Sequence, residues 1–124
     1  MAKDDGLAVK WYRLAANQGD AFARNSLGAM YTYGRGVAKD DGLAVNWFRM
    51  AADQGNAAAQ FNVGIAYANG QGVEKDVGLA YMWFNPAAAQ GSANAEKNRD
   101  RVASTMTPTQ IAEAQRLSRE WKAK

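Results

Sequence analysis

The sequence lacks cysteine and histidine altogether among its 124 residues. Their absence excludes thiol nucleophiles, disulfide frameworks, zinc sites built from Cys and His, and imidazole general bases, which together account for a large share of catalytic sites. We therefore expect a protein that is not an enzyme and that binds neither a metal nor a cofactor.

Long apolar runs and a strong charge of one sign are missing as well. The apolar runs fall well short of the roughly 20 residues that a membrane-spanning helix needs, and the first residues carry no secretory-signal pattern. We expect no membrane insertion, and both a cytoplasmic and a periplasmic location stay open. The net charge of +3 comes from residues 96–124, where seven basic side chains stand among four acidic ones. This mixture favours a solvated helix face over nucleic-acid binding.

What the sequence does contain is a repeat. The similar segments KDDGLAVKWYRLAANQG, KDDGLAVNWFRMAADQG and KDVGLAYMWFNPAAAQG begin 36 residues apart, at Lys3, Lys39 and Lys75. The first two units share 20 identities in 36 positions without a gap. A period of this length is typical of a solenoid of stacked helical hairpins. We predict one all-α repeat domain over residues 1–124, with units at 3–38, 39–74 and 75–106.

Each unit predicts two helices joined by a tight turn. An aspartate suited to a helix N-terminus stands where the first helix would begin, and a glycine suited to a left-handed cap stands where it would end. The first helices are expected to begin near Asp5, Asp41 and Asp76 and to stop at Gly19, Gly55 and Gly91. The second helices of the first two units would end at Gly34 and Gly70.

The helical projection predicts which side of each helix faces the core. An apolar stripe on the first helix contains Leu7, Ala8, Trp11 and Ala15, and it recurs in the later units. We predict that the four tryptophans lie in the core: Trp11, Trp47, Trp83 and Trp121. Gly28 and Gly64 recur inside the second helix, where a glycine costs about 1 kcal/mol relative to alanine. Their return at the same place predicts a close helix crossing.

These elements carry a family resemblance. The segments AVKWYRLAANQGDAFARNSLGAMYTYGRGV and AVNWFRMAADQGNAAAQFNVGIAYANGQGV resemble the Sel-1-like repeat, a relative of the tetratricopeptide repeat. The resemblance covers residues 3–91 and rests jointly on the Trp-aromatic, Ala-Ala, Gln-Gly and Gly-x-Gly-Val elements. It implies a right-handed superhelix of helical hairpins, as in bacterial members of the family, whose role is to bind other proteins without catalysis.

The end of the chain departs from the repeat. Arg99, Asp100 and Ala103 replace the packing residues of the second helix, so no further repeat is expected to stack there. A capping-box pattern with a favourable proline follows at Thr107, and we predict a C-terminal capping helix over 107–124. The first unit has no comparable cap, so we expect its N-terminal face to be apolar and the parent array to be longer.

Other patterns admit both a chemical and a structural interpretation. The segments Gly34–Gly36 and Gly70–Gly72 have the spacing of phosphate loops, but they follow a helix rather than a strand, which favours helix termination. The aspartates at the helix starts could hold a cation, but their recurrence at helix N-termini favours compensation of the helix dipole. Tyr33 projects outward and its counterpart is Asn69, so it is a further candidate for partner contact.

The candidate partner-binding residues are the variable, outward positions of the first helices. The resemblance implies that this helix lines the concave groove of the array. The candidates are Lys10, Arg13 and Asn17; Asn46, Arg49 and Asp53; and Met82 and Asn85. Arg13 and Arg49 lie one repeat apart and would hold acidic side chains or a peptide C-terminus through forked hydrogen bonds.

Our leading hypothesis is a non-enzymatic scaffold or adaptor that binds a partner protein or peptide in this groove. An alternative is a self-assembling or domain-swapping scaffold, which would use the apolar N-terminal face or a hinge at Pro86. This proline stands inside a predicted helix, where it removes the bond to the carbonyl of Met82, so we expect either a tolerated kink or a split helix. A cell-wall or β-lactam-related hydrolase ranks last, because the family members linked to those roles are cysteine-rich.

Overall fold

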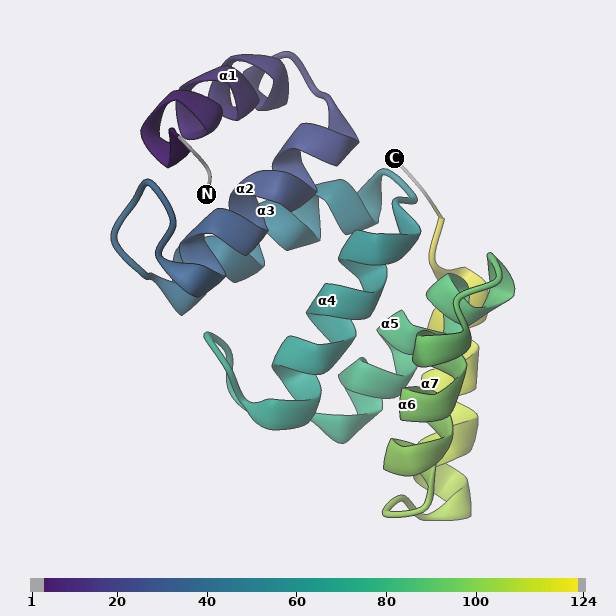
Figure 1. Ribbon diagram of the computed structural model, residues 1–124. Coiled ribbons are helices and arrows are strands. Elements are labelled where there is room, and N and C mark those ends of the chain that lie inside the picture. Colours follow the sequence, from purple (N-terminus) through teal and green to yellow (C-terminus); the bar gives the residue numbers. More distant parts are fainter. Residues whose placement is uncertain (1–3, 123–124) are drawn as a thin grey trace.

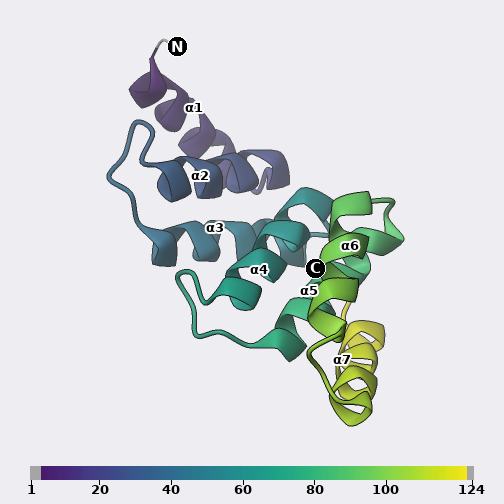
Figure 2. The same ribbon diagram turned by 60° about the horizontal axis from the view of Figure 1, so that its bottom comes forward.

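A computed structural model describes residues 4–122, which form seven α-helices and no strand. The helices are α1 (Asp5–Asn17), α2 (Ala21–Tyr33), α3 (Asp41–Asp53), α4 (Ala57–Asn69), α5 (Val77–Ala89), α6 (Ala93–Ala103) and α7 (Pro108–Glu120). They follow one another from α1 at one end of the molecule to α6 and α7 at the other (Figures 1 and 2). The predicted all-α solenoid is confirmed. No helix in this part of the chain is long and apolar enough to cross a membrane.

The helix boundaries lie where the sequence places its caps. The carboxylates of Asp4, Asp40 and Asp76 each accept a hydrogen bond from the backbone N–H three residues later, as N-caps do. The first helix of the third unit, α5, therefore begins at Val77, one residue after the predicted start at Asp76. Gly34 and Gly70 end the second helices in the left-handed conformation, with φ of 66° and 67°. The aspartates therefore cap helix N-termini and the Gly-x-Gly segments end helices, as their positions in the sequence indicated.

The two recurring glycines mark close contacts between neighbouring repeats. A Cβ added at Gly28 would lie 2.5 Å from a ring carbon of Phe48, and one added at Gly64 would lie 2.5 Å from a ring carbon of Phe84. Each glycine thus lets the first helix of the next repeat place an aromatic ring on the second helix of the repeat before it. The predicted close crossing is confirmed.

Glutamines also link adjacent repeats. Gln54 Nε2 donates to the carbonyl of Gly19 at 2.6 Å, and Gln90 Nε2 donates to the carbonyl of Gly55 at 2.9 Å. The side-chain oxygen of Gln54 accepts from Arg24 Nη1 at 3.1 Å. The Gln-Gly turn therefore joins consecutive units through its side chain as well as reversing the chain within each unit.

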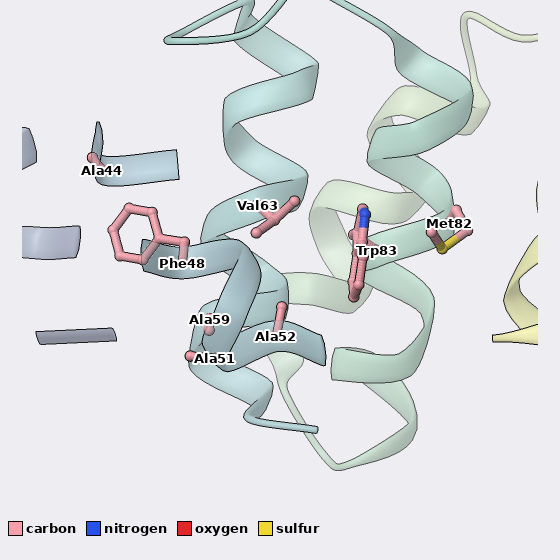
Figure 3. Close-up of a cluster of buried hydrophobic side chains, with 8 residues drawn as sticks. All are labelled: Ala44, Phe48, Ala51, Ala52, Ala59, Val63, Met82 and Trp83. Carbon is pink, nitrogen blue, oxygen red and sulfur yellow. The ribbon is translucent and has the colours of Figure 1, made fainter. Parts of the chain in front are cut away.

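The core is built across repeat boundaries. One buried cluster combines side chains from α3, α4 and α5 (Figure 3): Ala44, Phe48, Ala51, Ala52, Ala59, Val63, Met82 and Trp83. Trp83 of the third repeat is 1% exposed and contacts side chains of the second repeat. Trp47 of the second repeat likewise packs against a cluster of the first repeat, in α1 and α2. Each of these tryptophans covers the preceding unit.

Trp11 does not lie in the core, contrary to the prediction. Its side chain is 61% exposed, and Leu7 and Leu14 beside it are about half exposed. The periodic counterparts of Trp11 pack against the preceding repeat, which buries Trp83 and partly buries Trp47. The helix α1 is the first that the structure describes. The projection identified the correct face of the helix, but it could not show what covers that face.

The helix α5 continues through Pro86 without a break. Proline has no N–H to donate to the carbonyl of Met82, four residues earlier, so that acceptor is left free within the helix. Ser118 Oγ of α7 donates to it at 2.9 Å. The neighbouring Asn85 Oδ1 accepts from Arg99 Nη1 of α6 at 3.1 Å. The interrupted turn of α5 is therefore held by the two helices that pack beside it.

The capping helix α7 is also present, with the predicted capping box: Thr107 Oγ1 accepts from the N–H of Gln110 at 3.1 Å, and Gln110 Oε1 accepts from the N–H of Thr107 at 2.8 Å. It packs chiefly against α5. Its Trp121 ring meets the Trp83 ring edge to face, with centroids 5.6 Å apart. Trp121 is partly buried and lies at the edge of the core cluster, not fully inside it as predicted.

Candidate functional site

The outward sides of α1 and α3 carry six of the eight predicted contact residues. We call this surface the first-helix face. Lys10, Arg13 and Asn17 are exposed and line one depression of about 330 Å³ together with Leu14. On α3, Asn46 and Arg49 are exposed and Asp53 is half-buried. The structure thus brings the first three candidates together and leaves two of the next three, Asn46 and Arg49, exposed one repeat later.

The two arginines are held in place without being buried. Arg13 Nη2 donates to the hydroxyl of Tyr31 at 2.9 Å. Arg49 lies over the ring of Trp83, with Cζ 5.4 Å from the centroid, and its Nε is 3.8 Å from a carboxylate oxygen of Asp53. A cation over an aromatic face is attracted by the ring and keeps its charge available to solvent. Both guanidinium groups are therefore oriented before a ligand arrives.

The two candidates of the third unit do not share this open surface. Met82 is 9% exposed and belongs to the buried cluster, and Asn85 is bonded to Arg99. Met82 and Asn85 do occupy the positions on α5 that Asn46 and Arg49 occupy on α3, as the 36-residue period predicts. However, α7 packs over this side of α5, where Met82 is buried and Asn85 is only partly exposed.

Apolar residues of the first-helix face were missed by sequence reasoning. Leu43 and Met50 are 42% and 40% exposed, and Leu7 and Leu14 are similarly open. The projection assigned Leu7 and Leu43 to the core stripe. They lie at its edge, where the neighbouring helix no longer reaches. The signal that could have found them is that positions 14 and 50 are apolar although the outward positions beside them on the helix, 10, 13 and 17 or 46, 49 and 53, are polar.

A second hollow lies between α2, α3 and α4 and has a volume of about 340 Å³. Tyr33 stands at its rim and is 72% exposed, as the outward projection predicted. Arg35 lies over the Tyr33 ring, with Cζ 5.9 Å from the centroid. No group of three or more potential metal-binding side chains occurs among residues 4–122.

A family comparison accounts for this architecture. The Sel1 repeat model matches residues 1–20, 21–56 and 57–92. The chain belongs to the Sel1 repeat family. Sel1 repeats generally serve as protein-interaction scaffolds and bind protein partners. The open first-helix face spans two of these repeats.

Solved structures of other Sel1 repeat proteins resemble this one. The crystal structure of c5321, a protective antigen present in uropathogenic Escherichia coli strains and displaying an SLR fold, matches with a TM-score of 0.93 and 35% sequence identity. The match covers 98% of this chain and 27% of c5321, so this Sel1 chain spans about a quarter of that protein. A Sel1 repeat protein from Oxalobacter formigenes matches with a TM-score of 0.73 and 43% identity, over 75% of this chain and 70% of that one. No curated protein sequence matches at a significant level.

Proposed function

We propose that this Sel1 repeat protein is a non-catalytic scaffold that binds a partner protein or peptide on the first-helix face of α1 and α3. The observation that carries the proposal is the repeated exposure of large apolar side chains there. Leu7 and Leu14 on α1, and Leu43 and Met50 on α3, are each 40% exposed or more, and cationic side chains border them. Apolar residues surrounded by charged ones on a shared surface are typical of binding sites.

The test is selection of ligands from a phage-displayed library of random linear peptides on the purified protein. The affinity of the enriched peptides is then measured for two double variants. Leu43→Glu with Met50→Glu alters the proposed site, and we expect it to weaken binding at least about tenfold, because it places charge on both apolar residues of α3 in the contact. Both side chains are exposed, so the variant should retain its fold, which circular dichroism checks.

The matched control removes two exposed cations elsewhere. Lys97→Ala with Arg101→Ala changes α6, whose side chains lie outside the first-helix face, and should leave the affinity unchanged. The double variant Arg13→Ala with Arg49→Ala removes the same charge from the face and should weaken binding. Equal losses in the α6 variant and the arginine variant would contradict the proposal and indicate non-specific electrostatic attraction.

We propose self-association through the N-terminal apolar face as a second candidate function. It is favoured by the exposure of Trp11, whose counterparts Trp47 and Trp83 each cover a neighbouring repeat. Light scattering across a concentration series tests it: the average mass should rise with concentration, and Trp11→Lys should abolish the rise. A constant monomer mass would refute this candidate without affecting the first.

A further inference from the structure

The third repeat already holds a helix on the side that is open in the first two. On α5, Leu79, Met82 and Pro86 face α7: Leu79 and Leu117 line one cleft, Ser118 bonds the carbonyl of Met82, and Pro86 and Ser118 line a second hollow. The occupant is therefore an amphipathic helix of the chain itself, and it contacts three positions of α5 spaced over two turns.

The matching positions of the earlier repeats are exposed. One period before Leu79, Met82 and Pro86 stand Leu43, Asn46 and Met50, and two periods before stand Leu7, Lys10 and Leu14. The helices α1, α3 and α5 begin with the same aspartate cap, so α1 and α3 present two further seats with apolar ends and a polar centre. The distance from Leu43 to Met50 along the helix axis is about 10 Å, which suits two turns of a partner helix.

We propose that the first-helix face receives an amphipathic α-helix of a partner protein, seated on α3 or on α1 as α7 is seated on α5, with acidic residues beside its apolar stripe. The proposal rests on the proposed function and names the chemistry of the partner. It also specifies a conformation, because an extended peptide would not reproduce the contacts that α7 makes.

The acidic preference follows from the charges that border each seat. Three exposed cations, Lys10, Arg13 and Arg49, lie along the open seats. The anions lie elsewhere on them: Asp4 and Asp40 cap the helix starts beside Leu7 and Leu43, and Asp53 stands 3.8 Å from Arg49. The third repeat has Met82 and Asn85 at the corresponding positions and receives a helix of mixed charge. Arg116 of that helix is hydrogen-bonded to Glu113 and Glu120 and lowers the pKa of Glu113. A helix that binds α3 would gain from placing carboxylates opposite the arginines.

The apolar stripe of the partner follows from α7 as well. The side chains of α7 that contact α5 and its core clusters are spaced three or four residues apart: Ile111, Ala114, Leu117 and Trp121. Trp121 meets the ring of Trp83 edge to face and packs against the buried cluster to which Trp83 belongs. Trp47 holds the equivalent place in α3 and is partly buried, so it offers an aromatic anchor to an incoming side chain.

The experiment uses a phage-displayed helical library built on residues 107–122. The stripe residues of α7 are kept, and the exposed positions 113, 116, 119 and 120 are randomised. A matched library carries additional prolines in place of Ala112 and Gln115, which prevents a continuous helix. We expect enrichment from the first library alone, with Asp or Glu selected at two or more of the four positions.

Binding of the best synthetic peptide is then measured by fluorescence anisotropy. We expect its proline version, and the Leu43→Glu with Met50→Glu protein, each to bind at least about tenfold more weakly. Equal binding of the proline version would overturn the helical inference. Unchanged binding to the altered protein would also overturn it, since the peptide would then have replaced α7 on α5.

The two proposals fail in distinguishable ways. If random linear peptides bind the first-helix face and members of the helical library do not, the helix inference is wrong and the scaffold function stands. If neither library yields a ligand that depends on Leu43 and Met50, both are wrong. Selection of basic residues at the randomised positions would refute the acidic preference.

Discussion

Replacement of Pro86 tests how the structure tolerates a proline within α5. The free carbonyl of Met82 accepts from Ser118 Oγ at 2.9 Å, and Met82 is 9% exposed. Ser118→Ala should therefore leave a largely buried acceptor without this partner, at a cost of about 1–2 kcal/mol. In a Pro86→Ala background, the new N–H can donate to the Met82 carbonyl. There Ser118→Ala should cost nothing measurable, because alanine is also the better helix former.

The magnitude of the Pro86→Ala change can be bounded. A proline in a helix interior costs about 3 kcal/mol relative to alanine, and the bond from Ser118 offsets about 1 kcal/mol of this. We expect Pro86→Ala to stabilise the protein by about 1–2 kcal/mol, which corresponds to a rise in Tm of a few degrees for a domain of this size. Alanine is a better test than leucine, the residue at the equivalent position 14 of the first repeat, because leucine would add its own contacts with α7.

The assay is equilibrium unfolding in urea of the wild type, both single variants and the double variant, followed by circular dichroism and by tryptophan fluorescence. The coupling free energy between positions 86 and 118 should be about 1 kcal/mol or more. An equal cost of Ser118→Ala in both backgrounds would refute the reasoning. It would show that the hydroxyl does not compensate for the missing N–H.

Variants at four further positions test helix packing and helix propensity, each by urea unfolding. Gly64→Ala should destabilise the protein by about 1 kcal/mol or more, because its Cβ would overlap the Phe84 ring. Gly42→Ala, which is exposed and adds a better helix former, should stabilise it by up to about 1 kcal/mol. Gln54→Ala should cost about 1–2 kcal/mol, since its side chain bonds the preceding repeat. Trp121→Phe should cost much less than Trp121→Ala, because within residues 4–122 the buried indole N–H of Trp121 has no hydrogen-bond partner.

The architecture could be predicted because its signals are local and periodic. Asp40 caps α3 through its own side chain, and Gly34 ends α2 through its own backbone conformation. The requirement for glycine at position 64 could also be inferred, because a residue that is unfavourable in a helix returned after 36 positions. Its partner Phe84 could not be named, because the pairing depends on how two helices cross.

The state of the candidate site was only partly predictable. The sequence placed Arg13 and Arg49 on one outward surface, and both are exposed there. It could not show that α7 would cover Met82, because a terminal helix has no periodic template that fixes where it docks. For the same reason it could not supply the partner of the Met82 carbonyl, which lies 36 residues away at Ser118.

The central claim is that the first-helix face of α1 and α3 is the site where a partner binds. Amide chemical-shift mapping of the protein, titrated with the peptide selected from the helical library, tests this claim most directly. The account predicts that the largest shifts occur in α1 and α3 around Lys10, Arg13, Leu43 and Met50, while α6 is unaffected. Shifts confined to the hollow beside Tyr33, or to α5 and α7, would contradict it.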